Sequence, residues 1–211
     1  MRFTLLVVAQ IFCPTLVLAQ NPPAPQQPNT PSLPVAAASS FATTEVRLGG
    51  RYIGGRWVPG PAMLEGPARI TITYGQPHAR GRQIIGNVVP FDSVWRLGAN
   101  LATILHTDVD MTLGGTFLTK GEYSLYALPT KSDWQLIINR QIGQWGTDYD
   151  VSQDVARIPL RGRTLTDPVE SLTIYLIPAL DPKGTPRTMP HGTLAIVWGK
   201  TEFRTDWRIG R

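Results

Sequence analysis

The sequence has very little cysteine. Cys13 is the one cysteine among 211 residues, and it lies in an apolar segment at the start of the chain. If that segment is removed during export, the remaining chain can form no intramolecular disulfide, has no thiol nucleophile and cannot build a cysteine metal site. A cysteine-free mature chain depends on its hydrophobic core for stability.

Clusters of one charge sign are also absent. The formal net charge is +5 and becomes +4 without Arg2, and the basic residues are spread along the chain without a run of lysines or arginines. Nucleic-acid-binding chains concentrate basic residues on one face or in one segment. We therefore expect no nucleic-acid partner.

The common catalytic motifs are missing as well. The sequence has no Gly-x-Ser-x-Gly nucleophile elbow, and its three histidines, His78, His106 and His191, do not have zincin spacing. His106 alternates with Ile104 and Ala102, which predicts a position on the face of a sheet and not in a metal shell. We expect no cofactor.

Residues 1–19 are predicted to be a signal peptide, and residues 20–43 a flexible spacer. Arg2 precedes the run FTLLVVAQIFCPTLVLA, which is short for a membrane span, is interrupted by polar residues and ends as signal-peptidase sites do. The spacer begins QNPPAPQQPNTPSLP, a proline-rich composition that cannot bury enough apolar surface to fold. These segments predict an exported protein, periplasmic or secreted, with no stable membrane span after cleavage.

Residues 44–211 have the size of one domain, and their pattern is that of consecutive β-strands. RITITY, at residues 69–74, alternates apolar and polar side chains with the two-residue period of a half-buried strand. Similar runs occupy residues 102–109, 122–129, 133–140, 155–160, 171–178 and 193–199, with turn signals such as Gly114-Gly115 and Asp181-Pro182-Lys183-Gly184 between them. We predict a single all-β domain, an antiparallel β-sandwich or a jelly-roll-like barrel.

Between Arg69 and Gly199 several short motifs follow one another in a fixed order. They are Tyr74-Gly75-Gln76-Pro77, Gly81-Arg82, Pro90-Phe91, Trp95-Arg96-Leu97-Gly98-Ala99-Asn100, Gly121-Glu122-Tyr123-Ser124-Leu125, Asn139 and Trp145-Gly146. This series resembles the bacterial secreted family known as domain of unknown function 2911. The resemblance implies an exported β-rich domain without established catalytic residues. One departure is Leu101, where the family favours an acidic residue.

The motif around Arg96 has two interpretations. Trp95 and Arg96 point to opposite faces of a strand, so Arg96 either faces outward or is buried against a carboxylate such as Asp92 or Asp110. Asn100 suits a turn, because asparagine tolerates a left-handed backbone. In the second interpretation Arg96 and Asn100 belong to a site, together with the arginines of the ARGR segment at residues 79–82.

The shape of the arginine side chain explains why arginines would form such a site. Its planar guanidinium matches carboxylate or phosphate in two parallel hydrogen bonds, and Arg80 and Arg82 flank a glycine that permits close backbone approach. Trp145 lies in a glycine-rich segment, where a loop tryptophan can form a ligand platform. The ligand-binding candidates are Arg82, Arg96, Asn100, Asn139 and Trp145.

Catalytic and metal candidates are few. His78 and Asp92 are acid-base candidates, because each lies in a predicted loop near these arginines. Asp148, Asp150 and Asp154 occupy alternate positions like calcium ligands, but the glycine and glutamate of an EF-hand are missing, which leaves a looser calcium site or a solvated loop.

Three functions remain open from the sequence. The preferred one is non-catalytic binding of a small polar or anionic ligand, or of an envelope partner. The alternatives are a hydrolase or lyase that acts on an envelope or extracellular small molecule, and a structural interaction module without a pocket. The sequence does not decide the oligomeric state.

Overall fold

The computed structural model describes residues 39–60, 68–179 and 189–211, all of which belong to one compact unit, Ala36–Arg211. The predicted signal peptide, the spacer up to residue 38 and the expected turn at Asp181-Gly184 lie outside the described residues. Within the described residues no helix has the length and apolar character needed to cross a bilayer.

The described residues form eleven strands and one short 3-10 helix, Val151–Gln153, which confirms the all-β prediction. The strands are β1 (Ser39–Leu48), β2 (Gly50–Ile53), β3 (Arg56–Pro59), β4 (Ala68–Pro77), β5 (Thr103–Thr107), β6 (Met111–Leu113), β7 (Thr116–Leu118), β8 (Gly121–Pro129), β9 (Trp134–Asn139), β10 (Asp154–Pro178) and β11 (His191–Ile209). Residues 39–43, which the sequence placed in the spacer, form the first half of β1 because they pair with β4 from Ser39↔Pro77 to Thr43↔Thr73.

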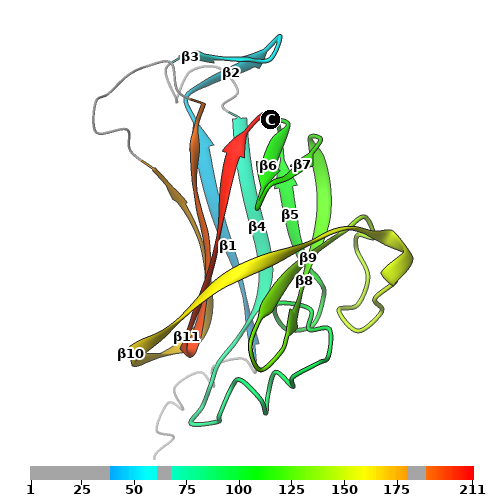
Figure 1. The fold of residues 1–211 in the computed structure, drawn as a ribbon, viewed down its shortest axis with the longest axis vertical. Helices are drawn as coiled ribbons and strands as arrows, with labels where there is room; N and C mark the ends of the chain where they lie inside the picture. The colour runs from blue at the N-terminus through cyan, green and yellow to red at the C-terminus, as the bar shows by residue number, and fades with distance from the viewer. Residues whose placement is uncertain (1–38, 61–67, 180–188) are drawn as a thin grey trace, which may run out of the picture. The chain divides into compact units, whose positions relative to one another are not determined.

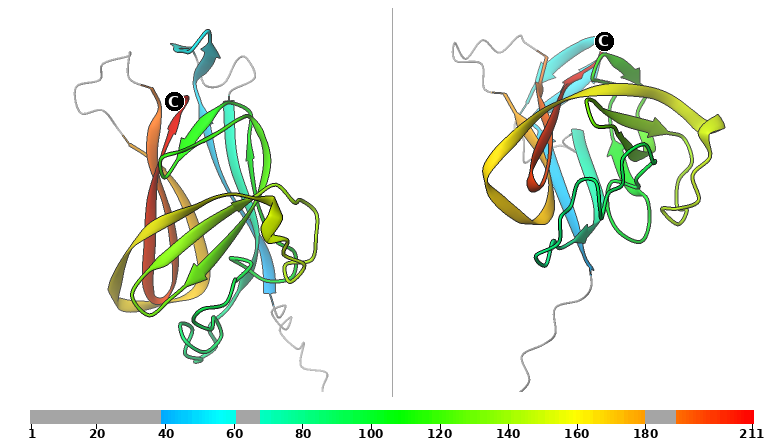
Figure 2. Two further views of the ribbon diagram at one scale, coloured as in Figure 1. Left: turned by 45° about the vertical axis from the view of Figure 1, so that its right-hand side comes forward. Right: turned by 60° about the horizontal axis from the view of Figure 1, so that its bottom comes forward.

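Nine strands form one antiparallel arrangement in the order β1-β4-β5-β8-β9-β10-β11-β6-β7, and β2 and β3 form a separate hairpin. The long strand β10 is shared by two layers, one with β1, β4, β5, β8 and β9 and the other with β11, β6 and β7 (Figures 1 and 2). Its first part, Asp154–Leu160, pairs with β9, and its later part pairs with β11 from Arg161 to Pro178. The pairing passes from one layer to the other between Leu160 and Arg161, where the partner of β10 changes from β9 to β11. Register shifts on both sides of Val169 then bend the β10–β11 ribbon.

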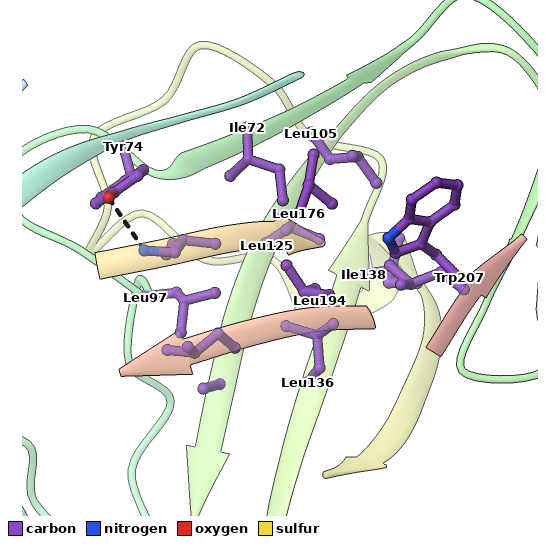
Figure 3. Close-up of a cluster of buried hydrophobic side chains, with 14 of the residues drawn as sticks. Ile72, Tyr74, Leu97, Leu105, Leu125, Leu136, Ile138, Leu176, Leu194 and Trp207 are labelled. Carbon is purple, nitrogen blue, oxygen red and sulfur yellow. Dashed lines mark hydrogen bonds between the residues drawn. The ribbon is translucent and has the colours of Figure 1, made fainter. Parts of the chain in front are cut away.

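The hydrophobic core lies between these layers (Figure 3). Ile70, Ile72 and Tyr74 alternate with more exposed residues along β4, as the sequence predicted, and all three are buried. The Tyr74 hydroxyl accepts a hydrogen bond of 3.1 Å from the backbone N–H of Ile174, which ties β4 to β10 across the core. A smaller apolar cluster of Ala102, Tyr126 and Ile137 lies apart from this core, with Val94, Leu128 and Tyr149 packed against it.

Candidate functional site

Two loops carry most of the residues predicted to form a site. The first loop follows β4, where His78 pairs with Ser171 of β10 in an isolated bridge. The chain then turns through Arg80 and Gly81, whose φ angles are 51° and 71°. The turn brings the Arg82 guanidinium back onto the main chain, where Nε donates to the Ala79 oxygen at 3.0 Å and Nη2 donates to the His78 oxygen at 2.7 Å. The carbonyl groups of His78 and Ala79 therefore hold the Arg82 guanidinium in one orientation.

Arg82 lies at the rim of a cleft of about 470 Å³. One wall is the segment from Ala79 to Ile85, and the other is the bend of the β10–β11 ribbon, which contributes residues including Glu170 and Lys200. Lys200 is exposed, and no carboxylate among the described residues is paired with it or with Arg82. Glu170 is already engaged, because its Oε1 accepts a hydrogen bond of 2.7 Å from the Arg80 N–H. The cleft thus holds two cations and one anion.

Aromatic residues lie directly behind this cleft. Trp95 stacks on Trp198 with a centroid distance of 5.9 Å and meets Trp134 edge to face at 6.4 Å. These three rings and Phe203 line a small apolar pocket that also includes Ile85 and Thr201, which border the cleft as well. Trp95 therefore faces the core, which agrees with one of the two orientations considered for it.

The Trp95–Asn100 motif packs tightly against Gly75 of β4, which indicates a role in the fold. Ala99 N donates to Gly75 O at 3.0 Å, and a Cβ added at Gly75 would lie 1.9 Å from the Ala99 oxygen. Leu97 is fully buried with a left-handed φ of 52°, and its carbonyl accepts a hydrogen bond from Thr103. Asn100 has a φ of 65°, so its predicted left-handed turn conformation is confirmed.

The second loop, residues 140–150, packs against Arg96 and Asn100. Gly146 N donates to Asn100 O at 2.9 Å, Leu101 forms a bridge with Trp145, and a Cβ added at Gly146 would lie 2.1 Å from Arg96 Cδ. The structure therefore brings Arg96, Asn100 and Trp145 together. Trp145 is 49% exposed. Arg96 has no carboxylate partner among the described residues, and its buried Nε–H donates no hydrogen bond to any of them.

Asn139 anchors the base of the same loop. It is fully buried, and its Nδ2 donates to Asp150 O at 2.8 Å and to Asp154 Oδ1 at 2.9 Å. Tyr149 donates to the other oxygen of Asp154 at 2.6 Å. Burial, together with this hydrogen bond and the charge of Asp154, raises the pKa of Tyr149 to about 12, so the phenol remains a donor at neutral pH.

The calcium candidates are engaged by protein groups. Asp154 accepts from Asn139, Tyr149 and Arg157, and Asp150 Oδ1 accepts from the N–H and hydroxyl of Ser152. Asp148 is exposed on the loop. Over residues 39–60, 68–179 and 189–211, no group of three or more histidine, cysteine, aspartate or glutamate side chains is arranged to hold a metal ion.

The two acid-base candidates do not meet in any hydrogen bond or ion pair of the described residues. His78 Nδ1 is 2.8 Å from the Ser171 hydroxyl oxygen. Asp92 is exposed on a different loop, with a φ of 59° and its N–H bonded to Pro129 O at 2.7 Å. The structure thus separates Arg82 and His78, beside the cleft, from the Arg96, Asn100 and Trp145 group.

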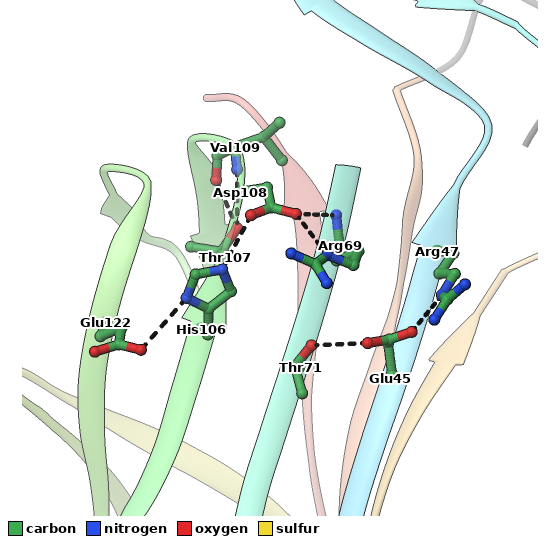
Figure 4. Close-up of polar contacts among 9 residues, drawn as sticks. All are labelled: Glu45, Arg47, Arg69, Thr71, His106, Thr107, Asp108, Val109 and Glu122. Carbon is green, nitrogen blue, oxygen red and sulfur yellow. Dashed lines mark hydrogen bonds and ion pairs between the residues drawn. The ribbon is translucent and has the colours of Figure 1, made fainter. Parts of the chain in front are cut away.

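His106 lies on the outer face of the sheet in a polar network (Figure 4). Its Nε2 is 3.0 Å from Asp108 Oδ1 and its Nδ1 is 3.6 Å from Glu122 Oε1, while Arg69 Nε donates to Asp108 Oδ2 at 3.0 Å. Burial alone would raise the pKa of Asp108, but the hydrogen bonds from His106 and Arg69 outweigh burial and lower it. This network links the neighbouring strands β4, β5 and β8.

The lowered pKa of Asp108 predicts a pH dependence of stability. A carboxylate whose pKa is lower in the folded state stabilises the fold above its unfolded pKa, near 4, and this stabilisation is lost as the pH falls through the folded value. We expect Asp108→Asn to reduce the free energy of unfolding by about 0.5–1 kcal/mol at pH 7 and by less at pH 3. Urea denaturation at both pH values measures this. Asp167→Asn, an exposed control, should change neither value, and an equal Asp108 effect at both would contradict the assignment.

A second hollow, of about 450 Å³, includes Thr112, His191, Trp207 and Arg208 in its lining. Its Asp206 is paired with Arg161 at 2.8 Å, and none of the residues predicted from the sequence lines it. In this second hollow the negative charge of Asp206 equals the positive charge of Arg208, whereas the residues that line the Arg82 cleft carry one more positive than negative charge. The cleft is therefore the better candidate for an anion.

Sequence reasoning found Arg82 but missed Glu170, Lys200 and the two isoleucines at 84 and 85. Lys200 directly follows the predicted strand at residues 193–199, so its position at the end of a strand could have marked it as a candidate site residue. Nothing in the sequence pairs it with Arg82, because the two are brought together only by the bend of the ribbon.

Comparison with known proteins agrees with the segments noted in the sequence. No curated protein and no solved structure matches the chain. A family model described as protein of unknown function (DUF2911) matches residues 62–206, which is more than half of the chain. The matched range includes both loops and both walls of the cleft. The chain therefore belongs to the DUF2911 family.

Proposed function

We propose that this protein is exported and that its β-sandwich binds a small anionic ligand, without catalysis, in the Arg82 cleft. The observation that carries the proposal is the pair of cations, Arg82 and Lys200, on opposite walls of one 470 Å³ cleft, neither of them paired with a carboxylate of the described residues. Volumes of about 300–1,000 Å³ are typical of small-molecule sites. Like charges that face one cleft repel each other unless an anion lies between them.

The orientation of Arg82 also supports this proposal. Its Nε and Nη2 are used by the Ala79 and His78 carbonyls, so the side chain is held in place before a ligand arrives. A prepositioned guanidinium loses less conformational entropy on binding than a free one. The remaining N–H groups can donate charge-assisted hydrogen bonds to an anion.

The other functions have less support. A hydrolase or lyase would need His78 and Asp92 near one substrate, but the contacts of these residues lie on different loops. A structural module without a pocket does not explain why two cations, neither paired with a carboxylate in the part of the chain that the structure describes, face one cleft. Export rests on the leader-like composition of residues 1–19, and the periplasm or the extracellular medium would supply the ligand.

The proposal predicts that charge removal at the cleft weakens anion binding. We expect Arg82→Gln and Lys200→Gln each to weaken acetate binding by about tenfold, the equivalent of one charge-assisted hydrogen bond. Amide chemical shifts in ¹H–¹⁵N spectra, followed during titration with acetate at constant ionic strength, give the affinity and locate the site.

Arg140→Gln is the matched control, because it removes the same charge from an exposed position outside the cleft. If Arg82→Gln also perturbs the turn that holds Arg82, Lys200→Gln still tests the charge, since the Lys200 side chain makes no hydrogen bond to any described residue. Titrations of the wild type with acetate, phosphate and a longer carboxylate such as hexanoate that all leave residues 79–85 and 199–201 unshifted would refute the proposal.

A further inference from the structure

We infer that the ligand of the Arg82 cleft is an amphipathic monoanion, an aliphatic or aryl carboxylate whose apolar body lies inside the cleft and whose carboxylate lies at the rim. The inference rests on the proposed function and specifies its ligand class. It is carried by three features of the cleft: apolar side chains on both walls, an excess of one positive charge, and aromatic residues behind the inner end.

Apolar side chains line the interior on both sides. Ile84 and Ile85 come from the loop after β4, and Pro168 comes from the bend of β10. Ile84 is buried, and a Cβ added at Gly199 would lie 3.2 Å from its Cγ1, so Ile84 packs against the opposite wall and closes the floor. A wholly polar ligand such as a sugar or a free phosphate would leave these surfaces without apolar contact.

The charged groups lie at the rim and select one negative charge. Arg82 and Lys200 are exposed, as is Glu170, whose carboxylate also borders the cleft. Two cations and one anion leave an excess of one positive charge. A monoanion neutralises this excess, whereas a dianion would place a second negative charge near Glu170.

The inner end of the cleft leads toward aromatic rings. Ile85 and Thr201 border both the cleft and the apolar pocket lined by Trp95, Trp134 and Trp198. That pocket is too small for more than a water-sized group, at about 10 Å³, so the apolar body of the ligand stays in the cleft and ends against Ile85. The cleft volume of about 470 Å³ lies within the range of small-molecule sites, which is enough for a carboxylate with six to eight carbons.

A chain-length series tests the inference on the full-length protein. We expect the dissociation constant of acetate, butyrate, hexanoate and octanoate to fall by about fourfold for each added methylene until the cleft is filled, as transfer of a methylene from water predicts. Titration calorimetry at constant ionic strength measures the affinities. Hexanol and hexylammonium, which have the same chain without the negative charge, should bind at least tenfold more weakly than hexanoate.

Two variants separate the apolar contact from the charge. Ile85→Ser should flatten the dependence on chain length and leave acetate binding unchanged, whereas Lys200→Gln should weaken every member of the series by a similar factor. Ile177→Ser is the matched control, because Ile177 is exposed on β10 and does not line the cleft.

The outcomes distinguish the inference from the proposed function. Equal affinity from acetate to octanoate, with binding still dependent on Lys200, would overturn the amphipathic ligand and leave the anion site intact. Hexanol binding as tightly as hexanoate would overturn the monoanionic head. A wild-type protein that binds neither acetate nor phosphate nor any longer carboxylate would overturn both proposals.

Discussion

Replacement of Gly75 by alanine is expected to lower the free energy of unfolding by about 3 kcal/mol or more. The added Cβ would lie 1.9 Å from the Ala99 oxygen and 2.7 Å from its carbonyl carbon, and both of these are backbone atoms. A backbone cannot rotate away as a side chain can. The two segments are also joined by the Ala99 N–H to Gly75 O hydrogen bond of 3.0 Å, so separation of the segments would lose that bond as well.

Urea denaturation followed by tryptophan fluorescence measures this change. Gly60→Ala is the control, because the nearest atom to its added Cβ is Gly50 Cα at 3.8 Å, and we expect it to change stability by less than about 0.5 kcal/mol. A Gly75→Ala protein with the denaturation midpoint of the wild type would show that the motif is not packed as described.

Replacement of Asn139 by aspartate is expected to cost about 3 kcal/mol at pH 7, because two hydrogen bonds are lost and a buried charge is gained. The aspartate keeps the oxygen that accepts from Gln141 N at 2.8 Å, but it loses the Nδ2 donors to Asp150 O and Asp154 Oδ1. The new carboxylate also lies next to that of Asp154. Like charges in a buried site repel strongly.

The pH dependence of this variant identifies the cause. The introduced carboxyl is more readily protonated in the folded state than in the unfolded state, so part of the lost stability should return as the pH falls from 7 toward 4. Denaturation curves at these two pH values provide the comparison. Asn87→Asp, at an exposed position, should show neither the loss nor the recovery. A loss of the same size at both pH values would mean that the new charge is not the cause.

The sequence predicted strands that a local pattern marks. Residues 69–74, 122–129 and 133–140 match β4, β8 and β9 closely. In β4 buried and more exposed side chains alternate, whereas β8 and β9 are buried along most of their length and were recognisable as short apolar runs bounded by turn residues. Two predicted strands, 155–160 and 171–178, are parts of the single strand β10. Their connection was not predictable, because residues 161–170 are mostly exposed and are held in the strand by pairing with β11.

The candidate site was predictable in part for the same reason. The turn at Asn100 was predictable because asparagine tolerates a left-handed backbone, and the turn before Arg82 was predictable from the neighbouring Gly81. The sequence grouped Arg82 with Arg96 because both are arginines in loops close in sequence. The structure assigns them to different surroundings, since Arg96 is covered by Gly146 from a segment fifty residues later, a contact that no local pattern contains.

The membership of β10 in both layers limits how the domain can move. Displacement of one layer relative to the other would break the ladder between β10 and β9 or the ladder between β10 and β11. Hinge or shear motions of the kind that close many binding proteins around a ligand would therefore disrupt the sheet itself. Because the bend of this ribbon forms one wall of the Arg82 cleft, both ladders hold that wall in place, and the ligand that we propose would meet a wall whose shape exists before binding.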